Sequence, residues 1–492
     1  MGNKFFLNFY FVMQSTFCIN NLKSIKMSKN QLLASSILIF IMLFYEQSLG
    51  VNLAIFSFIV WASMLLLTPK ATKDKMFWML SAGVFISGFS FAWYGDFISF
   101  CALFILCLVS CYYAMFGKSL HILLCPLLWV YNYASAIVRV FFFSQWIKSP
   151  HFKTASIKQL FAFIIIPLSF LLLFSLIYIS SSPMLMNYFR NFNLRLTLYG
   201  WQLLFLFLLG FFLMFNIYHF HVHTQLKAYN ETLHDNFTYS QTTTTKPRFS
   251  LLSIDMERKS GEITLFLLNM LLVFFLIMYN IEQFCSFSHE SFSNNIHERV
   301  NTLIFSIVMA IALIMFYFKS ALPFHKQASM LNYLAYAWIF LNTLLVFSAI
   351  ISNSEYVHQM GLTFKRVGVY IFLLLSLTGL VFTYLKIKNK KTNTYLMKNM
   401  FWSFIIALVL GSAINWSWIV TKYNLTCHSK PDMLYLTTLN FNKQILYKEL
   451  RNREISQHEI TEIETSIEND VNRERSNPFL SKTLYYEFVK LN

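Results

Sequence analysis

The side chains with the clearest chemical signal are four basic residues in short links between long apolar stretches. These residues are Arg190, Arg195, Lys365 and Arg366. A guanidinium group binds phosphate or carboxylate oxygens with two hydrogen bonds, and an ammonium group binds them as a point charge. If the four side chains converge, they would contact an anion such as a lipid phosphate or a substrate carboxylate. The alternative is that they pair with glutamates of the neighbouring links or with carboxylates of the C-terminal segment.

A second candidate is a histidine cluster, His219, His221 and His223, that follows an apolar stretch. His219 and His223 are four residues apart, so one helical face would present both to a divalent metal ion. His234 or Asp235 would supply a third ligand. Zinc motifs add a Glu or Cys at a fixed spacing, and this segment has none. A histidine-rich membrane edge without a metal is therefore the simpler interpretation, and we expect no metal and no cofactor.

Two carboxylates, Glu46 and Asp96, lie between apolar stretches. An ionisable group at membrane depth can relay protons or cations. Both positions also suit surface turns, because Glu46 lies in a short hairpin link and Asp96 ends the sequence Trp-Tyr-Gly-Asp. The chain has no P-loop, dinucleotide-binding glycine fingerprint, nucleophile elbow or zinc-protease helix. No catalytic residue is predicted, and we do not expect an enzyme.

The composition places these residues in a membrane protein. Apolar residues make up 57% of the 492 residues and charged residues 12%, with 55 Phe. The mean hydropathy is +0.52. Soluble domains carry about 25% charged residues. The net charge of +17 lies outside residues 421–492, where ten Lys and Arg balance ten Asp and Glu. This distribution is typical of orientation signals in membrane proteins and does not indicate a nucleic-acid partner.

Segments of about 20 apolar residues are long enough to cross a hydrocarbon core of about 30 Å. The sequence predicts an all-α polytopic bundle of about 11–12 spans with a small helical C-terminal tail. The predicted spans are residues 31–45, 51–67, 76–93, 97–116, 159–180, 196–218, 262–281, 299–318, 331–351, 367–386 and 400–420.

Residues 119–147 decide the topology. They are hydrophobic enough to cross, but Pro126, Asn132 and Arg139 interrupt them. If they do not cross, the links on one side, with Lys386 at their edge, hold 24 Lys and Arg, and the short opposite links hold four. Basic residues stay on the cytoplasmic side. We therefore expect a re-entrant or surface-lying helix with Arg139 turned to the lipid headgroups, a cytoplasmic N-terminus and an extracytoplasmic C-terminus. A twelve-span arrangement is the alternative.

The domain prediction has three parts. Residues 1–26 do not resemble a cleaved signal peptide. The Met-Ser-Lys-Asn sequence at 27–30 leads directly into the first span. Residues 1–26 are therefore interpreted as an N-terminal extension that is not native or is disordered. Residues 27–420 form the transmembrane domain, which includes a cytoplasmic loop at 219–261. Residues 421–492 form the aqueous tail.

Three segments of the chain resemble a known family. They are 31–53, which includes Phe-Tyr-Glu-Gln-Ser-Leu-Gly, then 361–372, and the group 414–416, 422–425 and 432–436. They are similar to a family of multi-pass inner-membrane proteins of Bacteroidetes, the domain of unknown function numbered 4173, over nearly all of residues 27–440. The resemblance implies a polytopic membrane protein of the inner membrane. It implies no activity and no catalytic residue.

The tail carries apolar residues three or four positions apart in a charged background, which predicts amphipathic helices at about 438–453 and 457–474. The apolar stripe would pack on the membrane domain, on a second copy or on a protein partner. Three functions remain open. The first is an accessory or envelope protein that binds membrane lipids and a partner. The alternative is a transporter or permease for a small solute or lipid, favoured by the many spans. An enzyme acting on lipid-linked substrates ranks lower.

Overall fold

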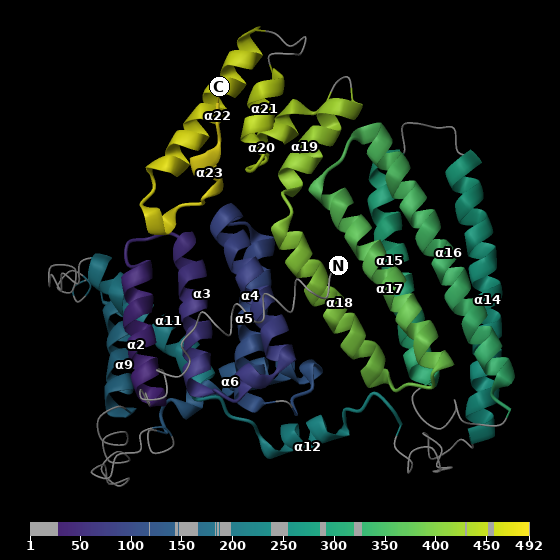
Figure 1. The fold of residues 1–492 in the computed structure, drawn as a ribbon, viewed down its shortest axis with the longest axis horizontal. Coiled ribbons are helices and arrows are strands. Elements are labelled where there is room, and N and C mark those ends of the chain that lie inside the picture. The colour runs from purple at the N-terminus through teal and green to yellow at the C-terminus, as the bar shows by residue number, and fades with distance from the viewer. Residues whose placement is uncertain are drawn as a thin grey trace.

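The computed structural model describes residues 28–117, 119–142, 146, 166–182, 184, 186, 198–237, 254–285, 292–318, 327–428, 431–450 and 457–491. Within these ranges the regular structure is helical, and the strand-like pairing is one isolated bridge between Asn236 and Lys391. The predicted all-α class is therefore confirmed. The helices form two lobes with one helix between them, and a helical tail covers one end (Figure 1).

The first lobe contains the helices up to residue 218. They are α2 (Lys29–Phe44), α3 (Val51–Leu67), α4 (Lys75–Tyr94), α5 (Phe97–Phe116), α6 (Cys125–Arg139), α9 (Ile166–Ser181) and α11 (Leu198–Tyr218), with the short 3-10 turns η2 (Ala71–Lys73) and η3 (Ile122–Leu124). Buried side chains of α2–α6 and α11 form one core. Within it, the fully buried Tyr218 hydroxyl bonds with Ser36 Oγ at 2.7 Å and Ser63 Oγ at 2.8 Å, which joins α11 to α2 and α3.

The second lobe follows a connecting helix, α12 (Thr224–Thr232). It consists of α14 (Ile254–Cys285), α15 (Phe292–Tyr317), α16 (Ser329–Met360) and α17 (Phe364–Lys388), which share a separate core. Helices of 32 residues such as α14 and α16 are about 48 Å long at 1.5 Å per residue. They therefore extend beyond a hydrocarbon core of about 30 Å.

Helix α18 (Asn393–Ala413) lies between the lobes and packs on α17 on one side and on α4 and α5 on the other. Figure 1 shows it crossing the middle of the molecule towards the tail. The predicted bounds of the last span, 400–420, are wrong, because the helix begins and ends seven residues earlier, at Asn393 and Ala413. The helix ends at Ala413 because Ile414 is extended and the Asn415 side chain caps a new helix by accepting a hydrogen bond from the Trp418 amide.

The tail consists of short helices. They are α19 (Trp416–Cys427), α20 (Met433–Thr438), α21 (Lys443–Leu450), α22 (Gln457–Ser476), η7 (Phe479–Ser481) and α23 (Tyr485–Phe488). The predicted helices at 438–453 and 457–474 correspond to α21 and α22. Their apolar stripes form a third core that includes Val357, Leu362 and Val367 from the end of the second lobe. The tail therefore packs on the membrane domain.

The tail also contacts the links of the first lobe at the same end of the bundle. The Val51 amide donates to the Lys482 carbonyl oxygen at 3.2 Å, and the Leu484 amide donates to the Ala92 carbonyl oxygen at 3.0 Å. The rings of Trp93 and Phe488 stack with centroids 5.1 Å apart. We call this end of the bundle the tail end.

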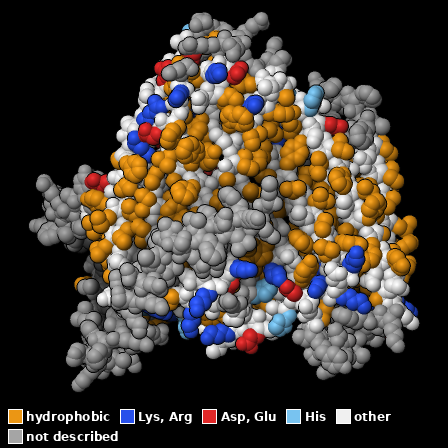
Figure 2. Space-filling view, in the orientation of Figure 1, with side chains coloured by type: hydrophobic (Ala, Val, Ile, Leu, Met, Phe, Trp, Pro, Cys, Tyr) orange, Lys and Arg blue, Asp and Glu red, His pale blue; other side chains and the backbone are white. Residues whose placement is uncertain are grey.

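Among the described residues, eight helices are long and apolar enough to cross a membrane, and three shorter helices are also apolar. On the face shown in Figure 2, hydrophobic side chains cover the middle, while Lys and Arg gather at the edge opposite the tail and on the tail itself. A polytopic membrane protein is the class that this surface indicates.

The segment η3–α6 is one of the eight apolar helices, but its two ends lie at the same end of the bundle. Just before η3, the His121 amide donates to Asn230 Oδ1 at 2.8 Å. At the other end, Arg139 Nη1 donates to the His219 carbonyl oxygen at 2.9 Å. Asn230 lies on α12, and Figure 1 shows α12 and α6 opposite the tail end; His219 directly follows α11. In this structure α6 does not connect the two ends, and its depth in a membrane stays a prediction.

Candidate functional site

The structure describes only two of the four basic residues of the proposed anion contact, Lys365 and Arg366. Arg190 and Arg195 lie outside the described residues, and Lys365 is exposed. Arg366 is buried, and its Nη1 donates to the carbonyl oxygens of Met360, at 2.9 Å, and Gly361. Arg366 therefore binds the backbone at the C-terminus of α16, where the carbonyl oxygens lack helical partners and a cation is favoured. An anion contact at Lys365 stays a prediction.

The two carboxylates considered for a relay lie in links at the tail end. Glu46 is exposed in the link between α2 and α3 and has a positive φ of 55°. Asp96 caps α5, because its carboxylate accepts hydrogen bonds from the Ser99 amide, at 3.0 Å, and from the Ser99 hydroxyl. Gly95 before it ends α4 in a left-handed conformation with φ 63°. These are the positions expected of turn and cap residues, and the relay role stays a prediction.

The expectation that His219 and His223 share a helical face is wrong, because α11 ends at Tyr218 and α12 begins at Thr224. His219 stacks on Phe215 with centroids 5.0 Å apart, and His223 caps α12. The described residues contain no group of three His, Cys, Asp or Glu side chains placed to hold a metal ion. Burial lowers the pKa of His219 to about 4, since the charged form loses its hydration.

Arg139 is held by the protein and is not turned to the lipid headgroups as expected. Besides the bond to the His219 carbonyl oxygen, its Nε donates to Ser135 Oγ at 3.0 Å and its Nη2 to Asn132 Oδ1 at 3.2 Å. Asn132 Oδ1 also accepts the His221 amide at 3.0 Å. This network fixes α6 against the end of α11.

The lobes are joined opposite the tail end by residues 230–237, which we call the strap. On one side, Asn230 bonds to the backbone of Ser119 and His121 in the first lobe. On the other side, the strap meets the link from α17 to α18 and the beginning of α18. Asp235 forms an ion pair with Lys398, and its carbonyl oxygen accepts a hydrogen bond from the Thr392 amide at 3.2 Å. Thr392 Oγ1 donates to the His234 carbonyl oxygen at 2.5 Å. Lys391 Nζ donates to Asn236 Oδ1, also at 2.5 Å.

Lys386, one of the 24 basic residues expected on the cytoplasmic side, is buried. The Lys386 side chain, on the last turn of α17, is 1% exposed, and its Nζ has no hydrogen-bond partner. The sequence gives no direct signal of this burial, because Lys386 lies among lysines 388, 390 and 391. The one sequence indication is its place in the α17 stripe that begins with Gly379 and Thr383, which are also buried.

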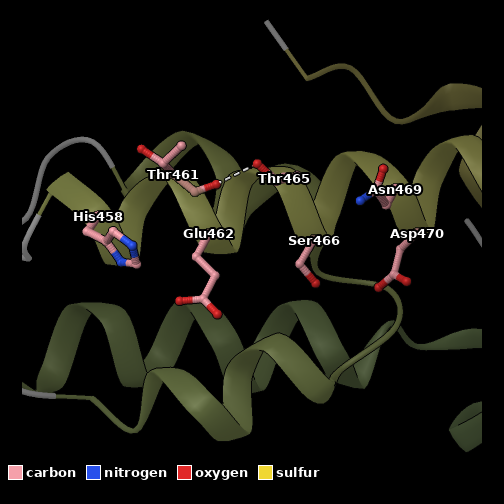
Figure 3. Close-up of a pocket in the computed structure, with 7 residues that line it drawn as sticks. All are labelled: His458, Thr461, Glu462, Thr465, Ser466, Asn469 and Asp470. Atoms are coloured by element: carbon pink, nitrogen blue, oxygen red, sulfur yellow. Dashed lines mark hydrogen bonds between the residues drawn. The ribbon is translucent and has the colours of Figure 1, made fainter.

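The outer surface of the tail is formed by α22. One side of this helix turns Ile460, Ile467 and Val471 into the protein. The other side borders an open groove of about 530 Å³, lined by His458, Thr461, Glu462, Thr465, Ser466, Asn469 and Asp470. Figure 3 shows Glu462, Ser466 and Asp470 pointing to the same side of the helix.

The groove is held in place by a buried cation beneath it. Lys443, on α21, is 2% exposed, and its Nζ donates to Asp470 Oδ2 and to the Thr437 carbonyl oxygen, each at 3.0 Å. Arg475 donates to the carbonyl oxygens of Tyr486 and Val489 and so attaches the C-terminal segment to α22. The sequence predicted the helix and its apolar stripe, but not these tertiary contacts.

The two helical lobes and the apolar surface define an all-α, multi-pass membrane protein. The chain belongs to the family described as the domain of unknown function DUF4153, whose model matches residues 75–449. The match runs from α4 to α21. The expectation of a family of unknown function is therefore confirmed, but the matching family is DUF4153 and not the family numbered 4173. No curated protein and no solved structure matches the chain.

Proposed function

We propose that this chain is a non-catalytic accessory protein of the membrane that binds a protein partner through its tail. The observation that carries the proposal is how the tail is held. The apolar sides of α21 and α22 are used in a core shared with the membrane domain, so the polar side of α22 faces outward in a fixed orientation. A preorganised polar surface loses little conformational entropy when a partner binds.

The proposed location is the inner membrane, with the N-terminus in the cytoplasm and the tail on the opposite side. Support comes from the positions of the basic links. The η2 link with Lys70 and Lys73 and the α17–α18 link with Lys390 and Lys391 lie opposite the tail end. Basic residues are retained in the cytoplasm. Exposed apolar side chains such as Phe205, Phe266 and Phe340 would contact lipid acyl chains.

The test is site-specific photo-crosslinking in living cells. A photoreactive residue at Thr461, Glu462 or Ser466 is expected to form a crosslink to one defined protein, and the same residue at Tyr229, exposed on α12 opposite the tail end, is not. The captured protein is then purified and tested for direct binding to the full chain in lipid nanodiscs.

A charge-reversal variant provides the control. Glu462→Lys is expected to weaken binding of the purified partner by about tenfold or more, because an exposed interface charge is reversed, while the melting temperature stays unchanged since Glu462 is exposed. Absence of a crosslink at all three α22 positions, or full binding by Glu462→Lys, would reject the tail as the binding surface.

A transporter is the second candidate, and the arrangement of two lobes on either side of α18 favours it, because alternating access moves one bundle against another. Flux of radiolabelled solutes into liposomes that hold the purified chain distinguishes the two functions. A flux that Glu462→Lys leaves unchanged would favour transport.

A further inference from the structure

Lys386 is a buried amine without a partner in the core of the second lobe. Its position follows from the α17 stripe. At Gly379 a Cβ atom would lie 3.0 Å from Ile311 Cδ1 on α15 and 3.1 Å from Met400 Sδ on α18. Lys386 is two helical turns further along the same face. Near this level Asn393 connects α18 to α15, because its Nδ2 donates to the Met315 carbonyl oxygen at 2.9 Å.

Among the described residues, no carboxylate lies within hydrogen-bonding distance of Lys386 Nζ. Residues 300–318 of α15, residues 329–354 of α16, α17 and α18 contain no Asp or Glu. On α14, Asp255 and Glu262 lie against Arg258, and Glu257 is a further buried carboxylate, which does not bond to Lys386 Nζ. The titratable side chains at this level are Tyr317 on α15, Tyr336 on α16, Tyr384 and Lys388 on α17, and Tyr395 and Lys398 on α18.

Among these groups, Lys398 is already paired with Asp235, and no described carboxylate bonds to Lys386 Nζ. Transfer of an unpaired charge from water into an apolar interior is strongly unfavourable even after relaxation. The buried arrangement therefore fits the uncharged amine, and a protonated Lys386 would have to reach water.

The backbone at Lys386 is connected to the strap through a short series of contacts. The Lys391 amide donates to the Lys386 carbonyl oxygen at 2.8 Å. The next residue, Thr392, bonds to the strap at His234 and Asp235. Any movement of the last turn of α17 towards water would therefore displace the link that holds the strap.

We propose that the Lys386 amine is a proton-binding site whose protonation releases the strap from the α17–α18 link. The ligand is the proton, and it binds at the lone pair of Nζ. The charged side chain then leaves the core, and the strap loses its contacts with Thr392 and Lys391. The two lobes would then be joined more weakly opposite the tail end, while the tail keeps its own contacts.

The experiment is hydrogen–deuterium exchange of the full chain in lipid nanodiscs, corrected for the intrinsic pH dependence of exchange. Lowering the pH from about 8 to about 5.5 is expected to raise exchange in residues 230–237 and 389–392 by about tenfold. Lys386→Met keeps the side chain uncharged and is expected to remove this effect. Lys388→Met, which changes an exposed lysine on the same turn, is expected to retain it.

The comparison with Lys386→Met is needed because two histidines, His121 and His234, also lie at the contacts of the strap. Wild-type exchange that does not depend on pH, or a dependence that Lys386→Met retains, would overturn the proposal. If Lys386→Met does not fold, the ¹³Cε shift of Lys386 is measured in the wild-type chain. A ¹³Cε shift that stays that of a charged amine over the whole pH range would also overturn the proposal.

Discussion

The guanidinium carbon of Arg366 lies 3.9 Å from the ring centroid of Tyr356, across the turn that joins α16 to α17. The same guanidinium binds the last carbonyl oxygens of α16, and the ring belongs to the helix that ends there. Arg366 therefore closes the turn on which the tail rests. Lys365, next to it, is exposed.

Arg366→Ala is expected to destabilise the protein by about 2–4 kcal/mol, because buried charge-assisted hydrogen bonds and a cation–π contact are lost together. The measurement is thermal unfolding in detergent, with protease sensitivity of the tail as a second readout. Lys365→Ala is the matched control and should leave both unchanged. Equal effects of the two variants would contradict the role assigned to Arg366.

Gly361→Ala is expected to loosen the contact between the same turn and the tail. Gly361 has φ 80°, and an added Cβ would lie 2.6 Å from Asn424 Oδ1, which accepts the Leu362 amide. Left-handed backbone alone costs a non-glycine residue about 1–2 kcal/mol. Gly368→Ala is the control, since a Cβ there meets nothing within 4 Å. The prediction fails if both variants unfold at the wild-type temperature.

Tyr218→Phe is expected to cost about 1–2 kcal/mol, because a buried hydroxyl with two hydrogen bonds is removed and Ser36 loses its partner. The midpoint of chemical unfolding measures the change. Tyr178→Phe removes an exposed hydroxyl and should have no effect. A stability equal to that of the wild type would show that the three hydroxyls do not hold α2, α3 and α11 together.

Acid should weaken the junction between α11 and α6. Burial lowers the pKa of His219 to about 4 in the folded protein, below its unfolded value near 6.5. The folded state therefore favours neutral His219. This contribution is fully present above about pH 6.5 and is lost as the pH falls towards about 4. With a discount for partial exposure, it amounts to roughly 1–2 kcal/mol.

Unfolding midpoints measured across this pH range test the prediction. His219→Gln cannot titrate and should flatten the acid side of the stability curve, whereas His223→Gln should leave its shape unchanged, since His223 is exposed. A wild-type acid dependence that survives in His219→Gln would assign the effect to another group.

Much of the helical architecture could be predicted from local patterns. Long apolar stretches predicted the positions of α2–α5, α9, α11 and α14–α17, although α14 and α16 extend beyond their predicted spans, and the Gly95–Asp96 pair marked a boundary between two helices. The last span was misplaced because hydropathy continues past Ala413, while a single side-chain cap at Asn415 starts a new helix. A continuous apolar segment does not show where the backbone changes direction.

The candidate sites could be predicted less well. His219 and His223 were placed on one helical face because the spacing of four fits a helix, and the chain is not helical there. Arg366 breaks the charge rule, but its partners are backbone carbonyl oxygens, which carry no sequence signal.

The sequence alone determined that this is a helical membrane protein with an amphipathic tail, because hydropathy and helical periodicity are local properties of the chain. Only the tertiary structure decided which charges are buried and what they contact. Asp235 and Lys398 meet across 163 positions of the chain, and Lys386 loses contact with water because α15, α16 and α18 pack against α17. Burial depends on neighbours that are distant in sequence, and no local pattern records them.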